Sequence, residues 1–259
     1  NYFNGLMHDA KIYNYARSPD QIKADYNYNL QNSAITPPTL TAGPIAWWKF
    51  DDIKGSTAFD SSGNNNHGRV YGATWSGGCL SFDGVDDYVY TGKYSNVINS
   101  FTMEMRINPS TTHEIDVEST SNLFGTNGRQ LGTSGQKYAL WPSHGDVNWG
   151  AHHAGAGISA GKNGISVYEH SHCYMPALLV WPGTLSGWTH IAVVYENKQP
   201  KLYVNGGLVR TGLTSTKMYV HPSIEQFGVG FNGFMDEVKI YNYARSAAEI
   251  QADYNTTHR

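Results

Sequence analysis

Charged residues are scarce in this sequence. The 18 Lys and Arg and the 21 Asp and Glu make up 15% of its 259 residues, against about a quarter in typical soluble proteins. The net charge is −3, and nucleic acid is not an expected partner because it requires a basic surface. No apolar run approaches the roughly 20 residues of a spanning helix, so we expect no membrane span.

Cysteine is almost absent, with only Cys79 and Cys173 in the whole chain. Two isolated cysteines do not match a zinc motif, which needs paired ligands close in sequence. An even number in a secreted chain permits one disulfide between them. The alternative is two separate buried thiols, and the sequence leaves both interpretations open.

Glycine and tyrosine are abundant instead, with 28 and 18 residues, and hydrophobic residues reach 40%. Together with many Asn, Ser and Thr residues, this composition suits strands joined by tight turns. It is also common in extracellular β proteins. We therefore expect a location outside the cell or at its surface.

The first 27 residues nearly repeat residues 229–255. The copies are offset by 228 positions, so that Phe3 aligns with Phe231 and Asn27 with Asn255, and both contain "KIYNYARS". No other segment repeats, which excludes an array of short units. The repeat predicts a fragment of a tandem-module protein. Its parts are the closing strand and helix of a preceding module (1–27), a proline-containing linker (28–43) and one domain (44–259).

Strand signals fill the proposed domain. Phe101, Met103, Met105 and Ile107 alternate with polar residues, which is the period of a strand with one buried face. Similar short segments follow one another, separated by turn sequences such as "SSGN" and "NGG". A single helix is expected from Ser246, which forms a capping box with Glu249. The pattern predicts an all-β jelly-roll sandwich of two antiparallel sheets with a short C-terminal helix.

Four motifs resemble a known family. They are "WWKFDD…AFDSSGNNNHGRVYGATW", "GGCLSFDGVDDYV", "GWTHIAVVYENKQPKLYVNGGLV" and "FNGFMDEVKIYNYARSAAEI". In this order they resemble laminin-G-like jelly-roll domains of the concanavalin A-like lectin/glucanase superfamily. The resemblance implies a non-catalytic binding or adhesion module that recognises carbohydrate or a surface protein, often with bound calcium. An insert at about 110–187 exceeds the usual length of the family.

Two other functions remain open. Glu114, Asp116 and Glu118 in "EIDVE" resemble the catalytic strand of glycoside hydrolase family sixteen. That resemblance implies a retaining β-glucanase with Glu114 as nucleophile, Asp116 as tuner and Glu118 as acid/base. The flanking Ser, Thr and Asn residues favour a polar loop instead. The third function is a structural subunit, in which residues 1–27 add a strand to the sheet of a neighbouring copy.

Oxygen-bearing side chains suggest calcium sites, since calcium prefers six to eight oxygen ligands. We expect Asp236 to face the core beside Val238 and Ile240, where a buried carboxylate needs a partner. Asp residues equally serve as turn formers and caps. The candidate ligands are Asp60, Ser62, Asn64, Asn66, Asp83, Asp86, Asp87 and Asp236.

The insert is rich in histidine and tryptophan, a combination that suits a sugar site with aromatic rings beside hydrogen-bonding groups. His170 and His172 would share one strand face, a spacing that also suits zinc or copper. Packing beneath loops is the third interpretation. The candidate ligand-binding residues are Trp141, His144, Asp146, His152, His153, His170 and His172.

Overall fold

The computed structural model describes residues 18, 43–52, 54–121, 131–172 and 174–256. The chain divides into two compact units, 1–42 and 43–259, and the second is described here. The predicted strand and helix at 1–27, and all of the linker except residue 43, lie outside this description. Within the described residues, no helix is long and apolar enough to cross a membrane.

The first sheet, sheet A, contains eight antiparallel strands. In spatial order they are β14 (Gly207–Thr211), β13 (Gln199–Val204), β12 (Thr189–Glu196), β7 (Phe101–Pro109), β17 (Asn232–Tyr241), β5 (Leu80–Asp83) and β4 (Thr74–Trp75), and β1 (Ala46–Trp48) pairs with the second half of β17.

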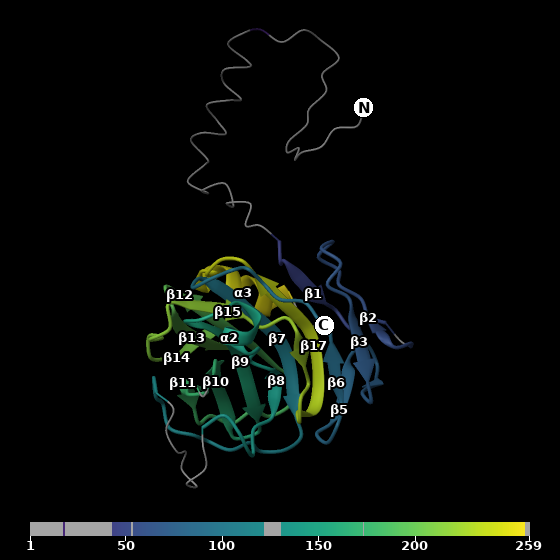
Figure 1. The fold of residues 1–259 in the computed structure, drawn as a ribbon. Coiled ribbons are helices and arrows are strands. Elements are labelled where there is room, and N and C mark those ends of the chain that lie inside the picture. Colours follow the sequence, from purple (N-terminus) through teal and green to yellow (C-terminus); the bar gives the residue numbers. More distant parts are fainter. Residues whose placement is uncertain (1–17, 19–42, 53, 122–130, 173, 257–259) are drawn as a thin grey trace. The chain divides into compact units, whose positions relative to one another are not determined.

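The second sheet, sheet B, contains nine strands. In spatial order they are β11 (Ala177–Trp181), β10 (Gly164–His170), β9 (His153–Gly161), β8 (Tyr138–Leu140), β16 (Gln226–Phe227), β6 (Tyr88–Tyr90), β3 (Gly68–Tyr71) and β2 (Thr57–Ala58), and β15 (Tyr219–Pro222) pairs with β9. Only the β15–β9 pair is parallel. The predicted two-sheet, all-β fold is confirmed (Figure 1).

The core lies between the two sheets. Phe101, Met103, Met105 and Ile107 of β7 are all completely buried in it, as their alternation predicted. The intervening residues Thr102 and Glu104 are buried as well. The outer face of β7 is therefore covered by the segment that leads into α3 (Ala247–Thr256), since Thr102 donates to Tyr243 O and Glu104 contacts Arg245.

Helix α3 begins at the predicted capping box and lies on the outer face of sheet A (Figure 1). The Ser246 backbone N–H donates to Glu249 Oε2 at 2.8 Å, and the Glu249 N–H donates to Ser246 Oγ at 3.3 Å. Ile250 is fully buried against Ala192 and Val194 of β12. An apolar contact and a cap thus fix both the start and the docking of the helix.

A bulge in β17 corrects the predicted orientation of Asp236. Met235 is fully buried, whereas Asp236 and Glu237 both point away from the core, and Val238 is buried again. Glu237 has a φ of 53°, and the register with β7 shifts there. The extra residue moves the alternation by one position. Asp236 therefore faces Arg106, 3.8 Å away, and burial followed by the charge of Glu237 raises its pKa to about 7.

Sheet B is covered on its outer face by part of the insert. The segment 142–148, which contains α2 (Gly145–Asn148), runs directly over β9. A Cβ on Gly155 would lie 2.2 Å from Ser143 O, and one on Gly157 would lie 2.4 Å from Pro142 N. The glycines of "HAGAGISAG" are therefore required by backbone packing. This strand was not predicted, because its composition resembles a loop.

Candidate functional site

The histidines and tryptophans of the insert gather on the outer face of sheet B. The strand register places them there: Tyr219 lies opposite His153, and both His221 and His170 lie opposite Gly155. They form two groups around α2. We call Tyr94, Trp149, His153, Tyr219 and His221 the aromatic platform. We call Trp141, His144, His170 and His172 the histidine cluster.

Parallel ring contacts hold the aromatic platform together. The rings of Trp149 and His221 are parallel, with centroids 4.0 Å apart. His153 stacks on His221 at 5.0 Å and contacts Tyr219 at 4.6 Å. Tyr94 meets Trp149 edge-on at 5.7 Å and keeps 42% of its surface exposed. Trp149, His153 and Tyr219 are half-buried and His221 is buried, so the accessible part of the platform is its edge at Tyr94.

Hydrogen bonds fix the protons of the two platform histidines. His221 Nδ1 lies 3.0 Å from Ser95 O, so it must donate to that carbonyl. In the neutral ring its Nε2 then accepts from His153 Nδ1, 2.7 Å away. Burial lowers the pKa of His221 to about 4 and keeps it neutral. Because His153 Nδ1 carries the proton of the neutral ring, the lone pair of His153 is on Nε2.

Two polar groups beside the rings bear on ligand binding. Trp149 Nε1 is buried and has no hydrogen-bond partner among the described residues. Tyr94 OH donates to Glu225 Oε1 at 2.9 Å, which fixes the exposed ring and presents a carboxylate next to it. The surface thus combines the exposed Tyr94 ring with a carboxylate acceptor, while the free N–H of Trp149 lies beneath it.

The histidine cluster includes His144, the N-cap of α2, whereas Trp149 of the platform is its C-cap. The rings of His144 and His170 are 4.5 Å apart, and His172 lies 6.3 Å from His144. Trp141 meets His170 edge-on at 6.1 Å. Asp146 is held by the hydroxyl of Ser171 next to this group.

Sequence reasoning found some of these residues and missed others. Of the predicted ligand-binding set, Asp146 and His152 belong to neither group. Asp146 lies next to the histidine cluster, whereas His152 is exposed and its carbonyl accepts from Met218. Tyr94, Tyr219 and His221 were not predicted, because β15 and the loop after β6 join the site only through folding. No local pattern in the sequence marks them.

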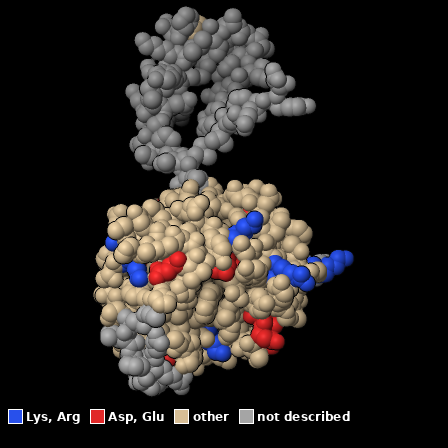
Figure 2. Space-filling view, in the orientation of Figure 1, with Lys and Arg blue, Asp and Glu red and all other residues tan. Residues whose placement is uncertain are grey.

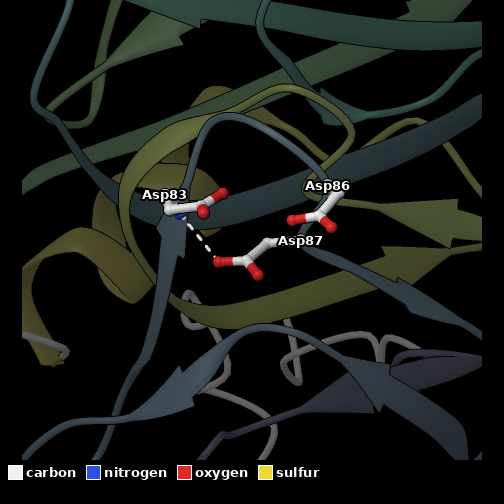
Figure 3. A group of neighbouring side chains, drawn as sticks. All are labelled: Asp83, Asp86 and Asp87. Atoms are coloured by element: carbon white, nitrogen blue, oxygen red, sulfur yellow. Dashed lines mark hydrogen bonds between the residues drawn. The ribbon is translucent and has the colours of Figure 1, made fainter.

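Three of the predicted metal ligands come together in the turn after β5 (Figure 3). Oxygens of Asp83, Asp86 and Asp87 all lie within 4.8 Å of one another, and no other such group occurs in the described part of the chain. Burial raises the pKa of Asp87, as do the charges of Asp83 and Asp86, although the Asp83 N–H donates to Asp87 at 2.8 Å. Three carboxylates fit the oxygen preference of calcium but supply only part of its shell. Calcium stays a prediction.

The other predicted calcium loop is closed by its own hydrogen bonds. Asp60 accepts from the backbone N–H groups of Trp47 at 2.9 Å and Asn66 at 2.8 Å, and also from Ser62. Burial acts to raise its pKa, but these bonds outweigh burial and lower it. The side chains of Ser62, Asn64 and Asn66 all donate to Ile45 O. These contacts describe a hydrogen-bonded turn.

The "EIDVE" segment does not form the strand that a catalytic role was expected to need. Residues 112–117 are irregular, and Glu118 makes only an isolated bridge to Ala177. Glu118 instead accepts a bidentate pair of hydrogen bonds from Arg210, from Nε to Oε1 at 2.9 Å and from Nη2 to Oε2 at 2.5 Å. Asp116 is buried and accepts from Tyr168 OH at 2.7 Å. The three acids therefore do not share a strand face, and the segment is irregular, as its flanking polar residues favoured.

The predicted disulfide is not formed. Cys79 is a buried free thiol whose Sγ lies 2.7 Å from Ser76 O. Burial, followed by the charge of Asp236, raises its pKa. Cys79 precedes β5 of sheet A, whereas the turn 171–174 joins β10 to β11 in sheet B. Cys173 lies outside the described residues.

Charged side chains are widely spaced on the face shown in Figure 2, where most of the described surface is neutral. This agrees with the low charge of the sequence. Recognition on such a surface relies on rings, hydroxyl groups and amides more than on strong fields.

Comparison with known proteins supports the fold. Residues 181–251 match the Laminin G 3 family model, described as the concanavalin A-like lectin/glucanases superfamily. No curated protein matches the chain. Among solved structures, domain 4 of AbnA, an extracellular GH43 arabinanase from Geobacillus stearothermophilus in complex with arabinotriose, is similar with a TM-score of 0.54 and 18% identity. The match covers 82% of this chain and 98% of that one.

Binding domains of botulinum neurotoxins are also similar. The binding domain of botulinum neurotoxin DC in complex with SialylT has a TM-score of 0.55 at 13% identity, covering 83% of this chain and 51% of that chain. The binding domain of botulinum neurotoxin serotype D has a TM-score of 0.57 at 12% identity, covering 83% and 52%. The chain thus spans about half the length of these toxin domains. The family match at residues 181–251 and the jelly-roll fold of the described residues confirm the predicted resemblance to laminin-G-like domains of the concanavalin A-like superfamily.

Proposed function

We propose that this chain is an extracellular, non-catalytic module that binds carbohydrate through the aromatic platform. The observation that carries the proposal is the row of rings on sheet B. Trp149, His221 and His153 stack in sequence, and the exposed Tyr94 stands at their edge. Tyr94 leaves 42% of its surface open at the edge of this row, and this open ring is the surface offered to a ligand.

The chemistry of the platform suits a sugar. One face of a pyranose or furanose ring carries C–H groups that pack on an aromatic surface, while its hydroxyl groups seek donors and acceptors at the rim. Here the rim offers the carboxylate of Glu225 and the lone pair of His153 Nε2. A small neutral surface with few polar anchors predicts weak binding of one or two sugar units.

The solved structures lend support of a general kind. The arabinanase domain is described in complex with arabinotriose, and the neurotoxin binding domain in complex with SialylT. Identities of 18% and 13% make these proteins guides to the fold alone. Their ligands suggest two chemically different probes for this chain, a neutral pentose oligomer and a sialylated oligosaccharide.

The catalytic alternative has less support. A retaining glycosidase needs two carboxyl groups roughly 5–5.5 Å apart at the sugar. Glu118 is engaged with Arg210, and Asp116 is buried in a hydrogen-bond network. We expect the unaltered chain to release no reducing sugar from β-glucans. Hydrolysis that disappears in Glu114→Gln and Glu118→Gln would contradict the non-catalytic proposal.

A binding assay with matched variants tests the platform. The wild-type chain is titrated with arabinotriose and with a sialylated oligosaccharide by calorimetry, after a screen on a glycan array. Tyr94→Ala removes the exposed ring, and Phe59→Ala, which is 52% exposed on a separate loop, serves as the control. We expect Tyr94→Ala to weaken binding of the preferred glycan at least tenfold while Phe59→Ala leaves it unchanged. No glycan binding by the wild type, or equal loss in both variants, would overturn the proposal.

A further inference from the structure

We propose that His144, His170 and His172 form a binding site for a divalent transition-metal ion such as Zn²⁺ or Ni²⁺. The three side chains come from separate elements. His144 is the N-cap of α2, His170 is the last residue of β10, and His172 follows in the turn to β11. Folding brings the first two rings to a centroid distance of 4.5 Å, with His172 6.3 Å from His144.

The backbone fixes which nitrogen of His170 is available. Its Nδ1 lies 2.9 Å from Pro142 O, and a carbonyl can only accept, so Nδ1 carries the proton. The lone pair of the neutral ring is then on Nε2. An imidazole that donates its second N–H to a carbonyl is the usual arrangement of a metal-ligating histidine.

His144 is held only loosely. Its Nδ1 accepts from the Val147 N–H at 3.4 Å, which is longer than a normal hydrogen bond. Within the described residues, no other hydrogen bond reaches the side chain of His144 or His172. The lone pair of His144 Nδ1 is therefore engaged only by this weak bond, which a metal ion would replace.

A carboxylate completes the surroundings. The Ser171 hydroxyl donates to Asp146 and holds its carboxylate in place. The anion lies near His144 and adds negative charge next to the imidazoles. Imidazole nitrogens beside a carboxylate suit zinc, nickel or copper, whereas calcium prefers oxygen ligands alone. The site is thus chemically distinct from the Asp83 turn.

The third ligand has to move. In the present side-chain positions, the ring nitrogens of His144, His170 and His172 are not all within 4.8 Å of one another. Among the described residues, only the carboxylates of the Asp83 turn are that close together. His172 is exposed on its turn, and rotation about its side-chain bonds is unhindered by burial. His144 and His170 therefore form a preformed pair that His172 closes when an ion binds.

Metal titration of the full chain tests this site. The chain is prepared without a histidine tag, treated with chelator and titrated with Zn²⁺ by calorimetry. Co²⁺ is added separately, and its visible absorption reports nitrogen coordination. His144→Asn keeps a cap for α2 but removes the ligand, and His172→Ala alters only an exposed turn. His152→Ala, an exposed histidine outside the cluster, is the control.

We expect one Zn²⁺ per chain in the wild type and in His152→Ala. His144→Asn and His172→Ala should each weaken binding at least tenfold and reduce the Co²⁺ absorption. Absence of a stoichiometric site in the wild type would overturn the inference. So would unchanged affinity in both variants, each of which is checked for folding by circular dichroism. The glycan assay uses Tyr94→Ala, whereas the metal titration uses His144→Asn and His172→Ala. A negative result in one assay therefore does not affect the outcome of the other.

Discussion

The indole of Trp149 and the imidazole of His221 lie parallel, 4.0 Å apart and inclined by only 1°. His221 is 2% exposed and has a pKa lowered to about 4 by burial. This contact joins the loop after α2 to β15, and it depends on a neutral His221. Protonation would place a charge in a site that offers it no carboxylate contact.

This relationship predicts a pH dependence. Between about pH 6.5 and 4 the unfolded chain binds a proton at His221 that the folded chain does not, so stability falls as the pH is lowered through this window. A shift from 6.5 to about 4 corresponds to about 3 kcal/mol at most. Urea unfolding at pH 7 and pH 4.5 should show a smaller loss in His221→Gln than in the wild type. An identical loss in both proteins would contradict the assignment.

A second prediction concerns the charges beneath α3. Arg245 contacts both Glu104 and Asp253, and Glu104 also lies 2.7 Å from His190 Nε2. Glu104 is only 1% exposed. Removing one partner of a buried pair costs about 3–5 kcal/mol because the other charge is left unpaired. We expect Arg245→Leu to lower the unfolding free energy by about 3 kcal/mol in urea titrations.

The matched control is Lys201→Met, which breaks the exposed pair with Glu196 on the same sheet. Exposed pairs contribute about 0–1 kcal/mol. A loss in Arg245→Leu no larger than that in Lys201→Met would show that the network adds nothing to stability.

The close approach of the insert to sheet B gives a third prediction. Gly157→Ala places a Cβ 2.4 Å from Pro142 N, so either β9 or the insert must shift. Overpacking of this kind costs about 1–3 kcal/mol. The change should also displace α2 and weaken whatever binds on either side of it. Gly207→Ala, where the nearest atom is 3.7 Å away, is the control for thermal unfolding. Equal melting temperatures for the two variants would contradict the packing argument.

Calcium is testable at the Asp83 turn. If the three carboxylates hold Ca²⁺, the ion relieves their repulsion, and the melting temperature should rise with Ca²⁺ and fall with chelator. Because the pKa of Asp87 is raised, the effect should weaken as the pH is lowered. Asp86→Asn should reduce the rise in melting temperature that Ca²⁺ causes. Glu196→Gln is the control and should leave that rise unchanged. A melting temperature that is insensitive to chelator would count against this site.

The repeat predicts assembly. The side chains that dock β17 and α3 on sheet A recur in the first copy at the corresponding positions. They are Lys239, Tyr241, Arg245, Ile250 and Asp253, matched by Lys11, Tyr13, Arg17, Ile22 and Asp25. We therefore expect residues 1–27 to be able to complete a sheet of the same kind in a neighbouring copy.

Deleting residues 1–27 should convert any assembly into a monomer, measured by light scattering after size exclusion. Arg17→Leu in the full chain should also reduce the size of any assembly. Arg17 corresponds to Arg245, whose guanidinium contacts Glu104 and Asp253, and the leucine variant lacks this charge. An unchanged particle size in the deletion variant would rule out assembly through this segment.

The sequence alone determined the class of fold and much of its interior. Phe101 to Ile107 alternate, and their inward face follows from that period because side chains on a strand point to opposite sides. The cap between Ser246 and Glu249 was equally local. Such features rest on contacts between near neighbours, which the order of residues specifies directly.

Other features were decided only by tertiary structure. The sequence "HAGAGISAG" forms β9 because a covering segment requires its glycines, and that segment becomes its neighbour only on folding. The bulge at Glu237 turns Asp236 away from the core, although simple alternation placed it inside.

The candidate site shows the same division. His153 could be proposed from the sequence, but Tyr94 and His221 could not, since they lie 59 and 68 positions away in the chain. Their rings meet because β15 runs parallel to β9 and the loop after β6 packs beside it. Local periodicity specifies which residues are buried, whereas contacts between distant strands decide which side chains share a surface. That difference is why the fold followed from the sequence and the site did not.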